Sequence, residues 1–583
     1  MTANTLPKDQ LIIVLAQIGS VLGDIKANAQ RIRQARHEAA ALSADLVMFS
    51  ELFLAGYPPE DLVLKPAFQD ACRSALEELA RETSDGGPAL LVGLPWREEG
   101  KLYNAYALLD HGRIETVRFK VDLPNYGVFD EKRVFSPGPM PGPVAFRGVR
   151  LGLPICEDIW GEDIVECLTE TGAEILLVPN GSPYWRGKGD ERLNIAVARV
   201  TESSLPMAYL NQIGGQDELV FDGASFVLNA NSALAVQLPA FTEALVATIW
   251  QRQARGWVCL EGPMAIAPEA DEADYTACML GLRDYVEKNG FPGVVMGMSG
   301  GIDSALCAAL AADALGPDKV HCLMLPYRYT SKDSLKDAED CAKALGVRYE
   351  ILPIEQAVKG LEDTLAPLFA GRQRDLTEEN LQSRVRGTIL MSISNKFGSM
   401  LVTTGNKSEM SVGYATIYGD MNGGFNPIKD LYKMQVFRLS SLRNRWKPQG
   451  AKGPDGEVIS QSILHKPPSA ELRDNQTDQD SLPPYDVLDD ILACLVEQDM
   501  TLAQIIARGH DEAIVKKVER LLYLAEYKRR QAAPGVKVTR KNFGRDRRYP
   551  IVNRFRDSGG PDFTPDPDIA PRRIIGGAER FEE

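Results

Sequence analysis

Short apolar runs alternate with amphipathic stretches along the first part of the chain. The runs at residues 11–15, 45–49, 89–93, 150–155 and 174–178 predict strands, and the stretch that ends near residue 42 predicts a helix. Alternating strands and helices are typical of α/β domains.

A second pattern of the same kind begins after residues 263–274, which are rich in Pro, Ala and acidic residues. A helix is predicted at 275–288, followed by strands at 293–298 and 319–325. This βαβ layout predicts a parallel sheet with a loop at the carboxyl end of its first strand. We therefore expect two α/β domains, 1–267 and 268–583.

Two stretches depart from this alternation. Residues 444–484 are polar and rich in Gly, Pro, Gln and Asp, which indicates either a disordered insert or a lid over a ligand. Residues 537–556 are basic and include Tyr549 and Phe555. This C-terminal tail would either bind nucleic acid or dock on a neighbouring domain or subunit.

Composition narrows the functional classes. The chain of 583 residues carries a net charge of −15, which argues against a general nucleic-acid binder. No apolar run approaches the roughly 18 to 20 residues of a membrane span, and Met1–Gln10 lacks a signal-peptide pattern. Nine scattered cysteines fit reduced thiols. We expect a cytoplasmic protein that binds neither membrane nor nucleic acid.

A phosphate-binding turn follows the strand at 293–298. Its sequence is Ser299-Gly300-Gly301-Ile302-Asp303-Ser304. Glycines let the backbone approach an anion, and the N–H groups of the following helix face phosphate. The lysine of a Walker A loop is missing, whereas the Asp303 carboxylate is suited to Mg²⁺ on pyrophosphate. The string resembles the pyrophosphate loop of the ATP pyrophosphatases, although a glycine pair before a helix also occurs as a simple turn.

Three polar residues stand at predicted strand ends in the first half. These are Glu51, Lys120 and Cys156. A cysteine attacks an amide when a base takes its proton and a cation stabilises the oxyanion, which Glu51 and Lys120 would provide. Taken singly, each has a simpler explanation, because most cysteines are buried hydrophobes and most Glu and Lys face water.

The residues around Glu51, Lys120 and Cys156 favour a catalytic role over these simpler explanations. Residues 49–59, 119–124 and 154–160 together resemble the nitrilase superfamily. The resemblance implies an αββα sandwich in which Glu51 is the base, Lys120 stabilises the tetrahedral intermediate and Cys156 forms a thioester. It further implies that Glu131 orients Lys120, and that glutamine is bound by Tyr126, Ser182 and Lys188.

The second half carries further motifs at 379–387, 404–409, 418–421 and 466–472. With the loop at Ser299, these resemble the NAD synthetase family, on a Rossmann-like parallel sheet. The resemblance implies ATP binding by Gly297, Met298, Ser299, Gly300, Gly301, Ile302, Asp303, Ser304 and Thr404. It also implies contacts of Asn380, Glu409 and Lys528 with deamido-NAD⁺, Mg²⁺ on Asp303 and Glu409, and Lys433 near phosphate.

The combined resemblance implies a carbon–nitrogen ligase that completes NAD⁺ biosynthesis. Deamido-NAD⁺ would be adenylated by ATP and amidated by ammonia from glutamine, through an enclosed ammonia channel. A homo-oligomer, a dimer or larger and up to an octamer, is expected. Two rivals remain: a GMP-synthetase-like ligase, disfavoured because its glutaminase pairs Cys with His, and a non-catalytic nucleotide-binding protein.

Overall fold

The computed structural model describes residues 9–474 and 476–557, so most of Met1–Gln10 lies outside it. The chain divides into two compact units, which are described separately. The first comprises residues up to Tyr184, Lys188–Glu269 and Arg283–Asn289, and the second comprises Trp185–Gly187, Ala270–Leu282 and residues from Gly290 onward. Within the described ranges, no helix has both the length and the apolar character needed to cross a bilayer.

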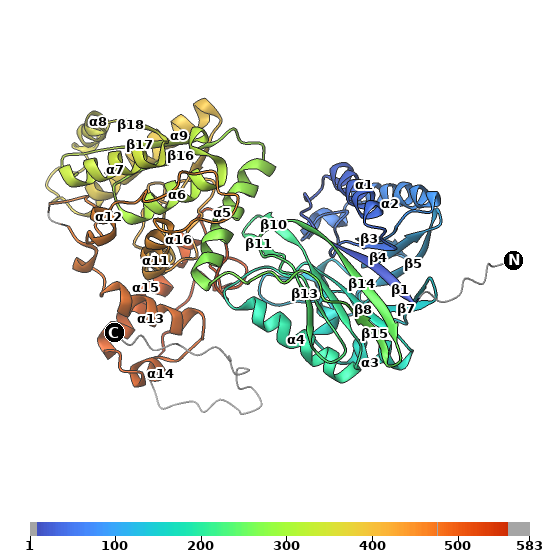
Figure 1. Ribbon diagram of the computed structural model, residues 1–583. Coiled ribbons are helices and arrows are strands. Elements are labelled where there is room, and N and C mark those ends of the chain that lie inside the picture. The colour runs from blue at the N-terminus through green and yellow to red at the C-terminus, as the bar shows by residue number, and fades with distance from the viewer. Residues whose placement is uncertain (1–8, 475, 558–583) are drawn as a thin grey trace. The chain divides into compact units, whose positions relative to one another are not determined.

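Two sheets form the centre of the first unit (Figure 1). The seven-stranded sheet has the order β15-β14-β1-β2-β3-β4-β5, and the six-stranded sheet has the order β13-β12-β9-β8-β7-β6. The strands are β1 (Gln10–Gln17), β2 (Leu46–Met48), β3 (Ala89–Glu98), β4 (Lys101–Asp110), β5 (Arg113–Phe119), β6 (Val144–Phe146), β7 (Val149–Gly152), β8 (Ile175–Asn180), β9 (Met207–Asn211), β12 (Phe226–Leu228), β13 (Leu234–Gln237), β14 (Ala244–Gln253) and β15 (Gly256–Cys259), with a separate hairpin of β10 (Ile213–Gln216) and β11 (Leu219–Asp222).

Side chains alternate across β1 and so build two layers of core. Leu11, Ile13 and Leu15 pack toward the second sheet. Val14 and Ala16 pack toward the helices α1 (Ile25–Ala41) and α2 (Pro66–Glu82). This two-residue period is that of a strand covered on both faces.

The second sheet is covered in the same manner. Its outer face packs against α3 (Asp163–Glu170) and α4 (Lys188–Ser203) through a separate apolar cluster. The order helix, sheet, sheet, helix confirms the predicted αββα sandwich. The predicted strand at 150–155 is shorter, because the chain leaves β7 after Gly152 and turns at Cys156.

The second unit is built on a four-stranded parallel sheet with the order β18-β17-β16-β19. Its strands are β16 (Val294–Gly297), β17 (Val320–Met324), β18 (Arg348–Ile351) and β19 (Met400–Val402). The chain runs outward from β16 to β18 and then returns to the other side of β16. The switch point between β16 and β19 is where a doubly wound sheet collects ligands at its carboxyl edge.

Helices surround this sheet, as the prediction of a Rossmann-like domain requires. They are α5 (Ala270–Lys288), α6 (Ile302–Leu315), α7 (Lys332–Leu345), α8 (Glu355–Leu365), α9 (Leu376–Phe397), α10 (Lys407–Val412), α11 (Lys433–Arg443) and α12 (Gln461–His465). A further apolar cluster joins α10 to α13 (Tyr485–Val496), α14 (Leu502–Ala507) and α15 (Glu512–Leu524), and the short α16 (Glu526–Arg529) follows.

The polar stretch after α11 is packed rather than a disordered insert. Asn444 accepts hydrogen bonds from the N–H groups of Val458 and Ile459 and donates to the Ile459 carbonyl. Val458 and Ile459 are buried. Arg443 also donates to the carbonyls of Pro454 and Gly456, so residues 444–459 form a closed loop.

The basic C-terminal segment also packs within the second unit. Lys537 is buried beside Asp546, at 2.5 Å. Arg547 pairs with Glu526 at 2.9 Å and stacks on the Tyr549 ring. Both of these cations are therefore paired with carboxylates inside the unit.

Candidate active sites

A buried cation lies between two carboxylates in the first unit. Lys120 Nζ lies 2.6 Å from Glu51 Oε1 and 3.0 Å from Glu131 Oε1. Burial opposes the charge of Lys120, yet Glu131 and Glu51 raise its pKa well above the usual range. Lys120 is therefore a fixed ammonium group at the end of β5.

Both carboxylates are held by further groups. Glu51 accepts from the Asn104 amide at 2.8 Å and from the Gly181 N–H at 2.9 Å. Glu131 accepts from the Tyr57 hydroxyl at 2.9 Å. The sequence analysis assigned no role to Asn104 or Tyr57, because each lies more than 50 positions from its partner along the chain.

Cys156 stands on a strained turn beside this cluster. Its φ is +48°, in the left-handed region that non-glycine residues rarely occupy. Burial raises the pKa of its thiol well above the usual range, and the charge of Glu51 adds to this rise. The thiol is protonated at neutral pH and needs a base to become a nucleophile.

The three residues expected to bind glutamine already have partners. The Tyr126 side chain is half exposed, and its hydroxyl lies 3.0 Å from Glu157 Oε1. Lys188 Nζ lies 2.9 Å from Glu191 and 4.0 Å from the centre of the Trp160 ring. Ser182 accepts from Arg192 Nε at 3.0 Å. Glu157, which directly follows Cys156, is a further polar group beside Tyr126 that the sequence analysis did not assign.

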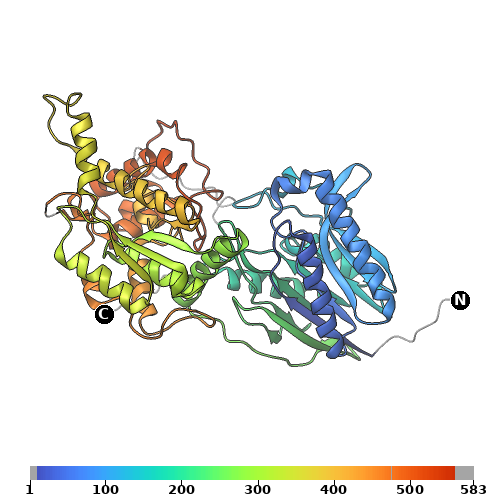
Figure 2. The same ribbon diagram turned by 90° about the horizontal axis from the view of Figure 1, so that it is seen from above.

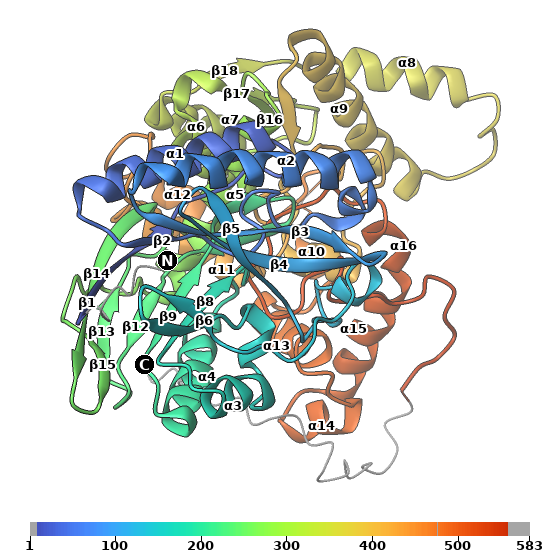
Figure 3. The same cartoon turned by 90° about the vertical axis from the view of Figure 1, so that its right-hand side faces the viewer.

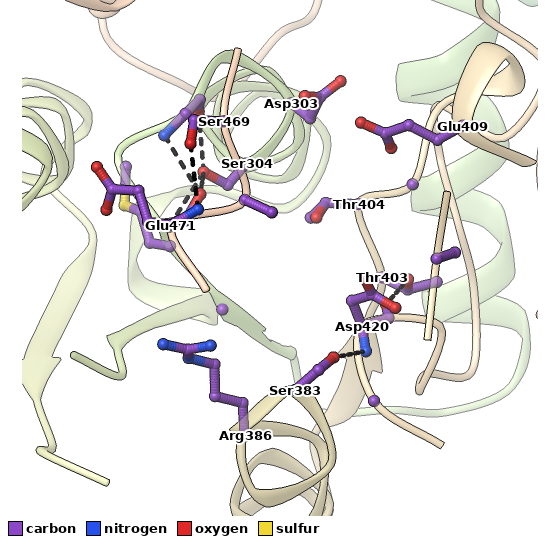
Figure 4. Close-up of a pocket in the computed structure, with 18 of the residues that line it drawn as sticks. Asp303, Ser304, Ser383, Arg386, Thr403, Thr404, Glu409, Asp420, Ser469 and Glu471 are labelled. Atoms are coloured by element: carbon purple, nitrogen blue, oxygen red, sulfur yellow. Dashed lines mark hydrogen bonds between the residues drawn. The ribbon is translucent and has the colours of Figure 1, made fainter. Parts of the chain in front are cut away.

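A cavity of about 300 Å³ lies at the carboxyl edge of the sheet in the second unit (Figure 4). Of the residues predicted to bind nucleotide, the following line it: Gly297, Met298, Ser299, Gly301, Ile302, Asp303, Ser304, Thr404, Glu409 and Lys433. The loop after β16 and the loop after β19 thus meet at one site, as their places in the sheet require.

The turn at Gly300 has room for glycine alone. Its φ is +78°, and an added Cβ would lie 2.3 Å from the Ser334 carbonyl oxygen. Within the turn, the Ser304 hydroxyl donates to the Gly301 carbonyl at 2.9 Å. The glycine therefore brings the start of α6 against the cavity.

Asp303 and Glu409 face one another at one side of this cavity (Figure 4). Lys433 Nζ lies 2.5 Å from Asp303 Oδ2 and 3.4 Å from Glu409 Oε1. Burial raises the pKa of Glu409 to about 8, and the charge of Asp303 adds to it. The Asn406 amide donates to Asp303 at 2.9 Å and its carbonyl caps α10 at Glu409 N–H, so one residue positions both carboxylates.

This donor set fits a magnesium ion. Mg²⁺ in nucleotide sites takes one or two carboxylates together with substrate phosphates and water. Within the described residues, no cluster of three or more His, Cys, Asp or Glu is suited to hold a metal by itself. Two facing carboxylates on the wall of an open cavity agree with a metal that arrives with nucleotide.

The other walls carry groups that the sequence analysis did not assign. The Arg386 guanidinium points into the cavity and donates from Nε to the Leu325 carbonyl at 2.9 Å (Figure 4). Residues 466–472 of the polar stretch also line the cavity. The Glu471 carboxylate accepts from the hydroxyls of Ser331 and Ser334, at 2.8 and 2.6 Å. This side of the site is thus tied to the start of α7.

Three predicted nucleotide-binding residues are not among those that line the cavity: Gly300, whose turn is described above, Asn380 and Lys528. Asn380 accepts from the Thr416 hydroxyl at 2.9 Å. Lys528 donates to the carbonyls of Gly413 and Ala415, both at 2.6 Å. Asn380 and Lys528 thus hold the loop between α10 and Asp420. This loop reaches the cavity through Tyr414 and Ala415.

Comparisons with known proteins agree with this division of sites. The carbon–nitrogen hydrolase family matches residues 13–257, and the NAD synthase family matches residues 275–532. The glutamine-dependent NAD(+) synthetase of Rhodobacter capsulatus is 53% identical over 549 residues, covering 94% of this chain and 99% of that protein. The enzyme of the same name from Xylella fastidiosa (strain Temecula1) is 46% identical over 552 residues, covering 94% and 99%.

A solved structure gives the same result. The glutamine-dependent NAD⁺ synthetase of Acinetobacter baumannii, in complex with ADP, matches with a TM-score of 0.74 and 41% identity over 93% of this chain and 99% of that one. The chain therefore belongs to the glutamine-dependent NAD⁺ synthetases, in which a nitrilase-like carbon–nitrogen hydrolase domain precedes an NAD synthase domain.

Proposed function

We propose that this chain forms NAD⁺, AMP, pyrophosphate and glutamate from deamido-NAD⁺, ATP and glutamine. One observation carries the proposal: the chain holds an amidase-type Glu, Lys and Cys set in one unit and a phosphate-loop cavity with two carboxylates in the other. All nine cysteines are unpaired, which supports a reducing, cytoplasmic location.

In the first unit, Glu51 would take the proton of the Cys156 thiol. The thiolate attacks the side-chain amide carbon of glutamine, and the oxyanion that forms faces Lys120. Ammonia departs with the proton from Glu51 and leaves a thioester. Water, activated by the same Glu51, then releases glutamate. Glu131 would keep Lys120 in place through the contact at 3.0 Å.

Glutamine recognition would use the charges around Cys156. The α-ammonium group of glutamine suits the Glu157 carboxylate, which Tyr126 already holds at 3.0 Å. The α-carboxylate suits Lys188, whose burial lowers its pKa although Glu191 opposes this. Ser182 would supply a hydroxyl at the same pocket.

In the second unit, the nicotinate carboxylate of deamido-NAD⁺ would attack the α-phosphorus of ATP. Pyrophosphate departs toward the turn at Ser299–Ser304 and the ammonium group of Lys433, and an acyl adenylate remains. Ammonia attacks its carbonyl carbon, and AMP departs. Thr404 would contact ATP, while Asn380, Glu409 and Lys528 would shape the binding site for deamido-NAD⁺.

Asp303 and Glu409 would hold Mg²⁺, which neutralises phosphate charge when it is bound. Lys433 already pairs with both carboxylates. It would keep them in place before nucleotide arrives.

Ammonia would pass from one reaction to the other without release. Free ammonia is mostly protonated at neutral pH and is then no nucleophile, so a glutaminase in the same chain is useful only if its product stays enclosed. We therefore include an ammonia channel and coupled activities in the proposal.

We also propose a homo-oligomer. The segment of α8 and the start of α9 projects from the second unit (Figures 2 and 3). It exposes large apolar side chains, including Leu361, Leu368, Phe369 and Leu376, of which Leu368 is 79% exposed. Exposed apolar surface of this kind supports a contact with a second copy.

The proposal is tested by measuring NAD⁺ and AMP formation from deamido-NAD⁺, ATP and Mg²⁺, with glutamine or ammonium as the nitrogen source. Equal amounts of NAD⁺ and AMP from both sources are expected. Failure with both sources would refute the synthetase function, and activity with ammonium alone would refute the glutaminase function.

A further inference from the structure

The Asp158 carboxylate joins two loops of the first unit. Its Oδ1 accepts from the N–H groups of Val121 and Asp122, at 2.9 and 2.8 Å. Its Oδ2 accepts from the N–H of Ile155 at 2.9 Å. Both oxygens are engaged, and the residue is buried.

The two loops carry two reacting groups of the proposed glutaminase. Val121 directly follows Lys120, and Ile155 directly precedes Cys156. These loops come from different sheets, since Lys120 ends β5 and Cys156 follows β7. The Asp158 carboxylate therefore joins the two loops directly, across the sandwich.

The turn that Asp158 holds is strained. Cys156 keeps a φ of +48°, which costs free energy that surrounding contacts must offset. The bond from Ile155 N–H fixes the residue just before this turn, within the short helix Cys156–Ile159. Loss of that bond would allow Cys156 to relax toward an ordinary backbone conformation.

We propose that Asp158 is a positioning residue that sets the distance between Cys156 Sγ and Lys120 Nζ. The proposal rests on the proposed glutaminase function. Asp158 itself contributes no atom to the reaction. A carboxylate is required because all three groups that it meets are N–H donors, so both of its oxygens must accept.

The substitution Asp158→Asn keeps the hydrogen bond to one loop and removes the hydrogen bond to the other. The amide oxygen of Asn still accepts from one loop, whereas its NH₂ group faces a donor of the other loop. The side chain keeps its size, so the packing changes little. Asp163→Asn, on the exposed start of α3, is the matched control.

We expect Asp158→Asn to lower kcat for glutamine hydrolysis about 100-fold, the effect of a misplacement of roughly 1 Å. KM for glutamine should change less than about threefold, because the groups that bind glutamine are intact. Alkylation of Cys156 by iodoacetamide, followed on its peptide by mass spectrometry, should slow. Ammonium-driven NAD⁺ synthesis should match Asp163→Asn.

An unchanged kcat in Asp158→Asn would overturn the proposal, as would parallel loss of ammonium-driven synthesis, which indicates general unfolding.

Hydrogen exchange on the unmodified chain gives a test without a variant: the amides of Val121, Asp122 and Ile155 should be protected together. Rapid exchange at these amides would also overturn it. Absence of glutamine hydrolysis in the unmodified protein would instead refute the proposed function itself.

Discussion

Lys120 Nζ lies 2.6 Å from Glu51 Oε1, and both side chains are fully buried. A buried ion pair of this kind costs desolvation energy that its own attraction barely offsets. This pair lies beside Cys156, whose thiol pKa is raised by burial and by the charge of Glu51, as expected where the charges serve chemistry.

Lys120→Met should both inactivate and destabilise the protein. It leaves Glu51 and Glu131 facing each other without a cation, which costs about 3–5 kcal/mol for a broken buried pair. Thermal unfolding of the full chain should begin at a lower temperature, and glutamine hydrolysis should be lost. Lys132→Met, at an exposed neighbour, is the control. Equal unfolding of the two variants would contradict the role of Lys120 as a buried counter-ion.

Glutamine hydrolysis should depend on pH through the Glu131 carboxylate. Burial raises the pKa of Glu131 to about 7 although Lys120 opposes this, and Glu51 adds to the rise. Below this pH Glu131 takes up a proton and no longer holds Lys120 as a charged partner, so kcat/KM for glutamine should fall as pH drops below about 7.

Glu131→Gln tests this assignment. It removes the carboxyl group that takes up the proton, so the fall near pH 7 should disappear. The pH profile of kcat/KM is the measurement, with ammonium-driven synthesis as the reference for other titrations. A fall that stays near pH 7 in Glu131→Gln would show that protonation of Glu131 does not control the rate.

Asp303→Asn should affect only the second unit. It removes one of the two facing carboxylates and the partner that Lys433 meets at 2.5 Å. Ammonium-driven NAD⁺ synthesis should fall by about 100-fold or more, while glutamine hydrolysis continues. Asp318→Asn, at an exposed turn, is the control. A loss of less than about threefold would contradict the assignment.

Chelation should separate the two activities. The donor set of Asp303 and Glu409 suits Mg²⁺, whereas the Glu51, Lys120 and Cys156 set has no metal in its proposed chemistry. EDTA should abolish NAD⁺ synthesis reversibly and leave glutamine hydrolysis in place. Synthesis that persists without divalent cations would contradict the metal site.

The sequence predicted the parts of both sites that lie at strand ends. Cys156, Lys120 and the turn at Ser299 each follow an apolar run, and a polar residue there is visible in a pattern. The roles of Asp158, Asn104 and Tyr57 escaped prediction, because the contacts that Asp158 makes with Val121 and Asp122, and those of Asn104 and Tyr57, join residues 36 or more positions apart along the chain.

The polar stretch after α11 is a second feature whose structure could not be predicted from the sequence. Its composition predicts disorder or a lid, yet Asn444 and Arg443 close it through hydrogen bonds to carbonyls and N–H groups of residues 454–459. Composition shows only that the stretch has few apolar side chains. It does not show that hydrogen bonds from a few buried polar side chains can hold the stretch in one conformation.

The most direct test of the account compares Cys156→Ala with the unmodified protein in NAD⁺ synthesis from deamido-NAD⁺ and ATP. Cys156 is the proposed nucleophile of the first unit, and it is not among the residues that line the nucleotide cavity of the second unit. The account predicts that synthesis with glutamine is lost and that synthesis with ammonium remains within about twofold. Loss of both activities, or retention of the glutamine-driven one, would contradict the division of the reaction between two sites.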